Sequence, residues 1–319
     1  MEITTRHRAS LYGDIAHGLG FWAERSAVHE AAARGRAAQL QQLIRDGAAV
    51  DAAAGDSIAP LHEACVQGHA RCVALLLAAG AQVDARNIDG STPLCDACAA
   101  GSPECVELLL DYGAAVNPPL CMSSPLHEAC VRGSSACVSL LMERGARMEA
   151  RDCCYGTPLH VACACQHYDC TKLLLNAGAN VNAAKLHETA LHHAAKTRRV
   201  DLIELLLEFG ADPHARDLAG KKAVQYTAPG SPAHGCFRFY EGTLARTMSI
   251  MSDICLTATL AYEWPRLGNF PTRELMSLAP FLFFCFVCFE DKFKLQAFSR
   301  YKNRSFIDLQ RGNSGVTAV

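Results

Sequence analysis

Two short sequence phrases recur along this chain at a nearly constant interval. Gly-Ala pairs begin at positions 47, 80, 113, 145, 178 and 210, so successive pairs lie 33, 33, 32, 33 and 32 residues apart. Pro-Leu-His or Pro-Leu-Cys begins at 60, 93, 125 and 158, with degenerate copies at 27 and 190. Self-similarity with this period indicates a stacked array of repeats rather than one closed core. Such arrays present a long surface to a partner, so binding is the first functional hypothesis.

One repeat, residues 87–119, shows how the period is built. Asp89-Gly90 is a turn signal, and Thr92-Pro93 suits the start of a short helix that Gly101 ends. A second helix is expected from Pro103 to Gly113. Two helices of this size cannot bury their apolar faces alone, so at least about three stacked units are needed. The chain has five clear units, a weaker first unit at 26–52 and a partial last unit at 216–227.

Cysteine is common, with 17 residues, but its positions follow the repeat. Cys65, Cys98, Cys130 and Cys163 share one position of four consecutive units, and Cys72, Cys105, Cys137 and Cys170 share another. A residue type that recurs at one position has a recurring packing role, which cysteine fills as a small, soft hydrophobe. We therefore expect buried, reduced thiols rather than a disulfide scaffold.

The repeated phrases carry a resemblance to a known family. Ser91-Thr92-Pro93-Leu94 and Gly156-Thr157-Pro158-Leu159-His160 resemble the ankyrin repeat, over roughly residues 26–227. The implied fold is an all-α ankyrin-repeat solenoid of about six repeats plus a partial cap. More distinctive phrases, at 84–98, 116–120 and 180–193, resemble the ankyrin repeat and SOCS box family. Members of that family are adaptors, in which the repeats bind a substrate protein and a C-terminal SOCS box recruits elongin B/C and cullin 5 to form a ubiquitin ligase.

The C-terminal part of the chain departs from the family pattern. A SOCS box begins with a Leu-x-x-x-Cys-x-x-x-Leu helix that docks elongin C, and the nearest string here contains Met251 and Cys255 but then Thr259. We therefore expect an N-terminal segment (1–25), the repeats (26–227), a linker (228–241) and a divergent region at the SOCS box position (242–319), mostly low in order with one or two short helices. The functional alternative is a stand-alone ankyrin scaffold, or an isoform that lacks a working SOCS box.

The motifs of common enzyme and metal sites are absent from the sequence. The histidine series, His29, His62, His127, His160 and His192, is spaced one repeat apart and cannot converge on one ion, so we expect these side chains to bond the backbone of adjacent loops. Cys95-x-x-Cys98 and Cys285-x-x-Cys288 each supply half of a zinc site and have no second pair nearby. No phosphate-binding loop, nucleophile elbow or zinc-protease motif occurs. We expect no enzyme activity, no metal and no cofactor.

The repeat register predicts which side chains form the partner-binding surface. Helix positions that are not used for stacking should face a concave groove, namely Glu63, Val66, Gln67, Asp96, Ala99, Ala100, Glu128, Val131, Arg132, Val161, Ala164, Cys165, His193, Lys196 and Thr197. The loop tips add Ser57, Ile58, Ile88, Met122, Tyr155, Leu186 and His187. Apolar residues at loop tips suggest anchors for a partner, with Ile88, Tyr155 and Leu186 preferred, although scattered exposed apolar residues are also common on soluble proteins.

Charge and hydropathy limit the classes of partner and the location. The formal net charge is −2, which gives no basic surface for nucleic acid or membranes. The first 20 residues contain no long apolar run, and the longest apolar stretch, 281–289, is about half of what a membrane-spanning helix needs. We expect a soluble, cytoplasmic protein.

Overall fold

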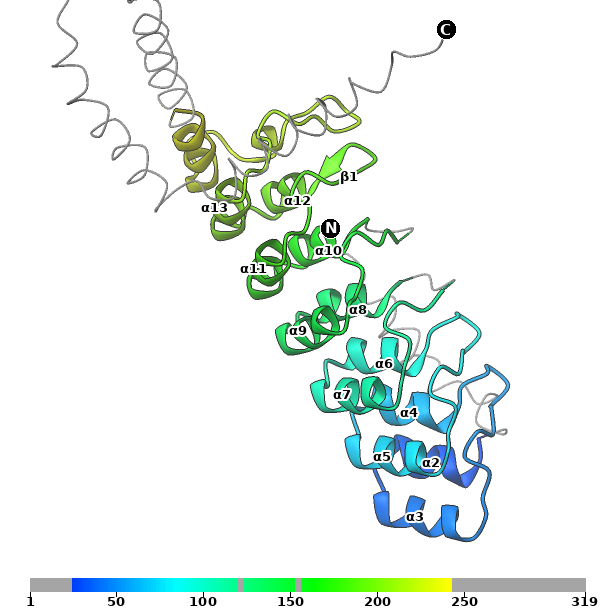
Figure 1. Cartoon of the computed structure of the whole chain (residues 1–319). Coiled ribbons are helices and arrows are strands. Elements are labelled where there is room, and N and C mark those ends of the chain that lie inside the picture. The colour runs from blue at the N-terminus through cyan, green and yellow to red at the C-terminus, as the bar shows by residue number, and fades with distance from the viewer. Residues whose placement is uncertain (1–24, 120–122, 153–155, 243–319) are drawn as a thin grey trace, which may run out of the picture.

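The structure is a computed structural model that describes residues 25–119, 123–152 and 156–242. Six pairs of short antiparallel helices stack side by side, and a long loop leads from each pair to the next (Figure 1). The inner helices are α2 (Ala27–Ala33), α4 (Pro60–Val66), α6 (Pro93–Ala100), α8 (Pro125–Arg132), α10 (Pro158–Ala164) and α12 (Ala190–Thr197). The outer helices are α3 (Ala37–Arg45), α5 (Ala70–Ala78), α7 (Pro103–Asp111), α9 (Ser135–Glu143), α11 (Tyr168–Asn176) and α13 (Val200–Glu208).

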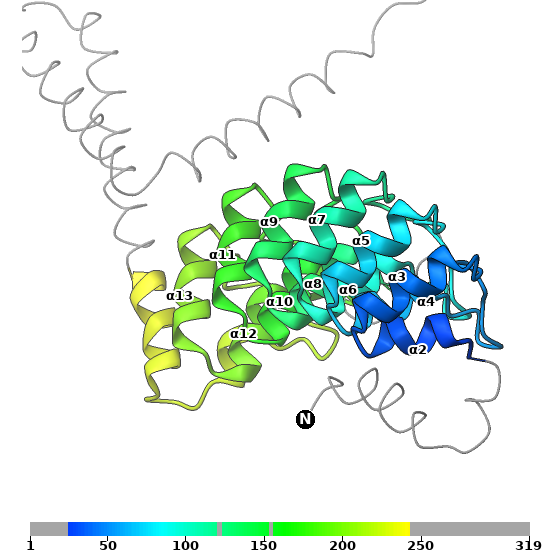
Figure 2. The same cartoon turned by 90° about the horizontal axis from the view of Figure 1, so that it is seen from below.

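The two rows of helices form separate layers, which Figure 2 shows from below. Each inner helix packs against the inner helix of the next pair, and each outer helix against the next outer helix. The loops between pairs, here called fingers, project to one side. One finger contains a hairpin of β1 (Ala184–Lys185) and β2 (Glu188–Thr189), and the last leads to a 3₁₀ helix, η2 (Ala223–Tyr226). The predicted solenoid with six repeats and a partial cap is confirmed.

Leucine and cysteine fill the space between the layers. Leu61, Leu94, Leu126, Leu159 and Leu191 occupy the same position of five inner helices and are almost completely buried. All eight periodic cysteines are inaccessible to solvent and free of disulfide bonds. Burial of each inner cysteine (Cys65, Cys98, Cys130 and Cys163) raises its pKa, for Cys163 to about 12. The packing role predicted for these thiols is therefore confirmed.

The periodic histidines join each inner helix to the following finger. In four of the repeats, the Nδ1 atom of the histidine accepts a hydrogen bond of 3.2–3.3 Å from a backbone N–H at the start of the helix, so the ring proton is on Nε2. Nε2 then donates to a carbonyl oxygen one repeat further on, at 2.9–3.4 Å. This histidine ladder (His29, His62, His127, His160 and His192) confirms the structural role. Burial lowers the pKa of the first four members, which favours the neutral form.

A second set of hydrogen bonds joins the ends of successive repeats. Asp51 accepts from the backbone of Gln82 at 2.8 Å, and Asp84 accepts from Ala115 at 3.0 Å. In the later repeats, side-chain oxygens accept hydrogen bonds from backbone N–H groups in the same way at 2.8–2.9 Å, namely Asn117 from Arg147, Glu149 from Asn180 and Asn182 from Asp212. Each repeat is therefore tied to its neighbour at the finger and at the repeat end, as expected for a solenoid whose stability comes from nearest-neighbour interfaces.

The chain continues as a helix after the last repeat. Residues 232–242 are helical, and Ala233 and Phe237 of this helix are buried in the core. The segment predicted as a linker, 228–241, thus contains a helix from residue 232 onward, and Phe237 and Ala233 on one face of it cap the end of the solenoid. The expected N-terminal segment, apart from Arg25, and the expected C-terminal region beyond 242 lie outside the described residues.

Candidate protein-binding surface

The inner helices and fingers together form what we call the inner face. On each inner helix, the residue directly after the ladder position is the first inner position, occupied from the second repeat to the sixth by Glu63, Asp96, Glu128, Val161 and His193. Sequence reasoning placed all five in contact with solvent. Glu63, Asp96 and Glu128 are only 9%, 5% and 6% exposed, and Val161 is fully buried in the hydrophobic core. The prediction that these four side chains are exposed was therefore wrong.

The buried carboxylates interact with neighbouring elements of the chain. Glu63 Oε1 lies 2.8 Å from the guanidinium of Arg25, which also approaches Asp56 at 4.0 Å. Asp96 accepts a hydrogen bond of 3.0 Å from the hydroxyl of Ser91, in the finger before its helix. Burial raises the pKa of Glu63, and the charge of Arg25 opposes this effect. The fingers thus cover the start of each inner helix, which explains why helical periodicity alone overestimated the exposure.

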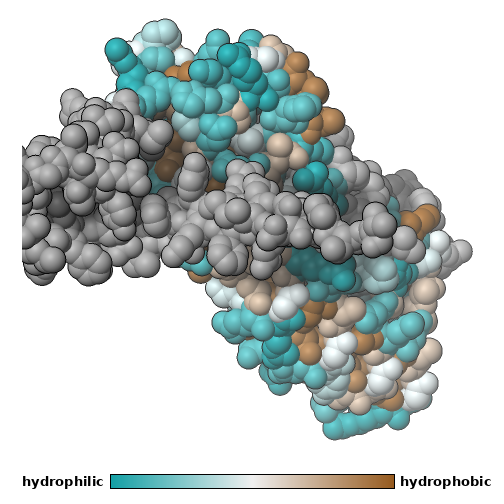
Figure 3. Space-filling view, turned by 45° about the horizontal axis from the view of Figure 1, so that its top comes forward, coloured by the Kyte–Doolittle hydropathy of each residue, from teal (hydrophilic) through white to brown (hydrophobic). Residues whose placement is uncertain are grey.

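Positions further along the inner helices are more open. Gln67, Arg132 and Lys196 are exposed, while Val66, Val131 and His193 are partly exposed. These side chains remain available on the inner face, as the repeat register predicts. Where the surface is coloured in Figure 3, hydrophilic side chains alternate with small hydrophobic patches.

The sixth repeat and η2 bring together a cluster of charged and aromatic side chains. Lys196 Nζ lies 2.5 Å from Glu188 Oε1 and 5.0 Å from the centre of the Tyr226 ring. Lys221 Nζ lies 5.6 Å from the same ring. His193 lies 3.7 Å from Glu188, and burial lowers its pKa to about 4, so it is neutral near pH 7. This end of the inner face is therefore lined by two ammonium groups on one aromatic ring.

Three finger tips expose large apolar side chains. Ile88 is 78% exposed and Leu186 is 67% exposed, as predicted for tips, and Leu218 is 69% exposed. Sequence reasoning missed Leu218, although Asp217-x-x-Gly220 repeats the turn signal Asn87-x-x-Gly90 around Ile88. By contrast, Ile58 was predicted at a tip and is buried, because its carbonyl oxygen holds the histidine ladder and its side chain turns inward.

The hairpin tip has an unusual backbone. Leu186 and His187 form the two-residue turn between β1 and β2, with φ values of 48° and 64°. Such turns strongly favour Asn-Gly, because two successive positive φ angles disfavour side chains with a Cβ atom. An exposed leucine is therefore held in a costly conformation. The other predicted tips, Met122 and Tyr155, and the predicted elongin-docking residues Met251 and Cys255 lie outside the described residues.

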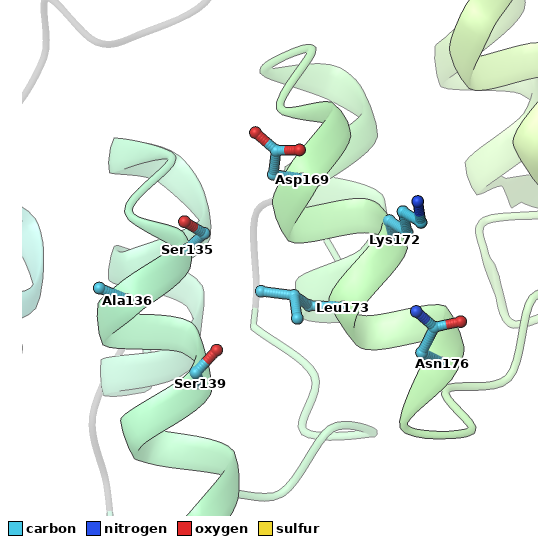
Figure 4. Close-up of a pocket in the computed structure, with 7 residues that line it drawn as sticks. All are labelled: Ser135, Ala136, Ser139, Asp169, Lys172, Leu173 and Asn176. Carbon is cyan, nitrogen blue, oxygen red and sulfur yellow. The ribbon is translucent and has the colours of Figure 1, made fainter.

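The hollows of the described surface do not form an enclosed site. One lies between the outer helices α9 and α11 and is lined by small and polar residues, among them Ser135, Ser139 and Lys172 (Figure 4). Within residues 25–119, 123–152 and 156–242, no group of His, Cys, Asp and Glu side chains could hold a metal ion. No helix in these ranges is long and apolar enough to cross a membrane.

Comparisons with known proteins agree with this architecture. A family model of ankyrin repeats, in three copies, matches residues 28–120 and 126–217. Ankyrin repeat and SOCS box protein 13 from Homo sapiens is 69% identical over 237 residues, which are 74% of this chain and 84% of the relative. The chain belongs to the ankyrin repeat and SOCS box family. The Mus musculus protein of the same name matches with the same identity and coverage.

Solved structures of the repeats are also similar. The crystal structure of the human ASB11 ankyrin repeat domain matches with a TM-score of 0.66 and 39% identity, over 68% of this chain and 98% of that one. The ankyrin repeat domain of Bcl-3 matches with a TM-score of 0.56 and 28% identity, over 67% and 98% of the two chains.

Proposed function

We propose that the protein is a non-catalytic substrate-recognition adaptor, whose ankyrin repeats bind a target protein through the inner face. The observation that carries this proposal is the row of exposed apolar finger tips, Ile88, Leu186 and Leu218, along one side of a solenoid. Exposed apolar side chains of this size lose contact with water when a partner covers them, at roughly 1.5–3 kcal/mol for a fully buried residue. The strained turn at Leu186 supports a functional role for that tip, since strain is retained where it positions a contact.

The proposed complex is a cullin-RING ubiquitin ligase of the elongin B/C and cullin 5 type. Its support is the membership of a family named for the SOCS box, together with Met251 and Cys255 at the spacing of the first two anchors of the elongin-docking helix. Met251 and Cys255 are the proposed elongin-docking residues. A protein with this role works in the cytoplasm, uses no cofactor and contacts neither nucleic acid nor membrane.

A stand-alone ankyrin scaffold is the second candidate. The observation that favours it is the departure of residues 242–319 from the SOCS pattern, with Thr259 where the docking helix needs an apolar residue. Co-purification of the full chain with elongins B and C separates the two candidates. The adaptor predicts recovery of both elongins and cullin 5, and loss of that recovery in Met251→Asp/Cys255→Asp. Absence of elongins from the unmodified chain would favour the scaffold.

Target binding is tested separately from ligase assembly. Ile88→Ser and Leu186→Ser should reduce the amount of a target protein that the full chain captures from cells. Tyr112→Ser is the matched control, because Tyr112 is 50% exposed but lies at the end of the outer helix α7. Equal capture by all of these variants would contradict a role for the fingers.

A further inference from the structure

The inner face changes its charge along the axis of the solenoid. The first inner position holds a carboxylate in each of the first four repeats, then valine, then histidine, and then the tyrosine whose ring is close to two lysines, in the order Glu30, Glu63, Asp96, Glu128, Val161, His193 and Tyr226. One residue per repeat, with helices packed about 8–10 Å apart, spreads this change over the whole array. The row therefore changes from acidic to uncharged side chains, and the positive charge at the far end comes from Lys196 and Lys221 beside Tyr226.

The wider surroundings follow the same division. Described residues 25–152 contain 15 acidic and 10 basic side chains, whereas residues 156–242 contain 8 acidic and 9 basic side chains. Arg25 lies 2.8 Å from Glu63, Arg34 lies 2.6 Å from Glu30, and Arg132 is a further exposed basic side chain on the inner helix α8. These basic side chains reduce the negative potential of the first repeats but leave the excess of acidic residues there, so the difference between the two ends persists.

The basic end is the more accessible of the two. Lys196 and Lys221 are exposed, and the Tyr226 ring holds both ammonium groups on the same surface. Glu188 pairs with Lys196, and Asp217 accepts a hydrogen bond from the Tyr226 hydroxyl. An incoming anion therefore competes with Glu188 for Lys196 and is attracted mainly by Lys221. The acidic side chains at the other end are largely covered by fingers and act through their field, which a surface with low-dielectric walls concentrates.

We propose that the inner face binds one extended segment of the target protein that carries opposite charges at its two ends. A lysine- or arginine-rich part lies over the repeats of Glu63, Asp96 and Glu128, and an aspartate- or glutamate-rich part lies against Lys196 and Lys221. The uncharged level of Val161 lies between them. The two charged zones are two repeats apart, about 20 Å, which an extended chain spans with about six residues. This inference rests on the proposed target-binding function and names the chemistry of its partner.

Synthetic peptides of one composition test the charge pattern directly. The first carries four lysines, a six-residue Gly-Ser spacer and four glutamates, and the second carries the same residues with lysine and glutamate alternating. Fluorescence anisotropy with the full chain at low ionic strength should give binding of the block peptide about tenfold tighter than that of the alternating peptide, and the difference should shrink in about 0.3 M salt. Equal binding of the two peptides would overturn the proposal.

Substitutions of lysine test whether the basic end causes the preference for the block peptide. Lys196→Gln/Lys221→Gln should weaken the block peptide to the level of the alternating peptide, while Lys172→Gln on the outer helix α11 should leave it unchanged. Equal weakening by Lys172→Gln, or no weakening by the double variant, would refute the assignment. Thermal melting of each variant checks that the fold is retained.

The chain's own C-terminal segment is the competing occupant. Residues 292–311 contain six Lys or Arg and one Asp, and lie outside the described residues. Carbodiimide cross-links from these residues to the exposed carboxylates Glu30 or Asp89 in the peptide-free chain would show that this segment occupies the face, and would overturn binding of a target segment there. A failed peptide preference with retained sensitivity of target capture to Ile88→Ser would remove this inference and leave the proposed function standing.

Discussion

Replacing one member of the histidine ladder should destabilise the whole stack. His127 is almost completely buried, accepts a hydrogen bond from the Ser124 hydroxyl at 2.7 Å, and donates to the carbonyl oxygen of Gly156 at 2.9 Å. His127→Ala leaves that buried carbonyl without its partner, at about 1–3 kcal/mol, and removes the packing of the ring. We expect a loss of about 3 kcal/mol in the free energy of unfolding.

The chain contains its own control for this prediction. Cys95 occupies the ladder position of the third repeat, where its sulfur lies 3.6 Å from Thr92 Oγ1 and 3.9 Å from the carbonyl oxygen of Ser123. Sulfur forms weak hydrogen bonds, so Cys95→Ala should cost only about 1 kcal/mol. His127→Gln should fall between the two, because Gln225 accepts a backbone N–H at the equivalent position of the last unit, at 2.8 Å.

Urea unfolding of the full chain, followed by far-UV circular dichroism, measures these differences. The urea midpoint should fall in the order unmodified chain, Cys95→Ala, His127→Gln and His127→Ala, while the slope of the free energy against urea concentration stays unchanged. Equal losses for His127→Ala and Cys95→Ala would refute the reasoning, because the ladder would then contribute no more than a buried thiol.

Three further predictions concern protonation, backbone geometry and thiol reactivity. Burial lowers the pKa of four ladder histidines below the unfolded value of 6.5, so the unfolded chain binds more protons in acid. The free energy of unfolding should therefore have its full value above about pH 7 and fall as the pH drops through 6.5. Urea titrations at several pH values measure this change. Arg198 has a φ of 58° at a position where the first four repeats carry glycine, so Arg198→Gly should raise the thermal midpoint by the equivalent of about 0.5–1 kcal/mol. Gly133→Ala should lower it, because a Cβ atom would lie 2.3 Å from the His167 ring. Brief thiol labelling of the native chain, read by mass spectrometry, should leave all eight periodic cysteines unmodified, and rapid modification of Cys98 or Cys130 would contradict their packing role.

The repeat period accounts for most of what could be predicted. Helix α6 runs over Pro93–Ala100 and α7 over Pro103–Asp111, as the Pro and Gly signals of one unit indicated. The buried cysteines and the histidine ladder followed from the same reasoning, since a residue type that recurs at one position makes a recurring contact. These features depend on local signals and on contacts that every repeat makes.

Exposure on the inner face could not be predicted in the same way. Helical periodicity indicates that Glu63 and Val161 lie away from the outer helix, but how closely a finger covers them depends on contacts between repeats, such as that of Arg25 with Glu63. The helix at 232–242 was missed because no repeat phrase marks it, and only the burial of Phe237 shows that it completes the core.

Site-specific photo-cross-linking in cells tests most directly that the finger side of the repeats is the protein-binding surface. A photoreactive phenylalanine analogue replaces Ile88, Leu186 or, as the control on the outer row, Tyr112 in the full chain. We predict that positions 88 and 186 give an adduct with the same protein and that position 112 gives none. Adducts from position 112 alone, or no adduct from either finger, would contradict the account.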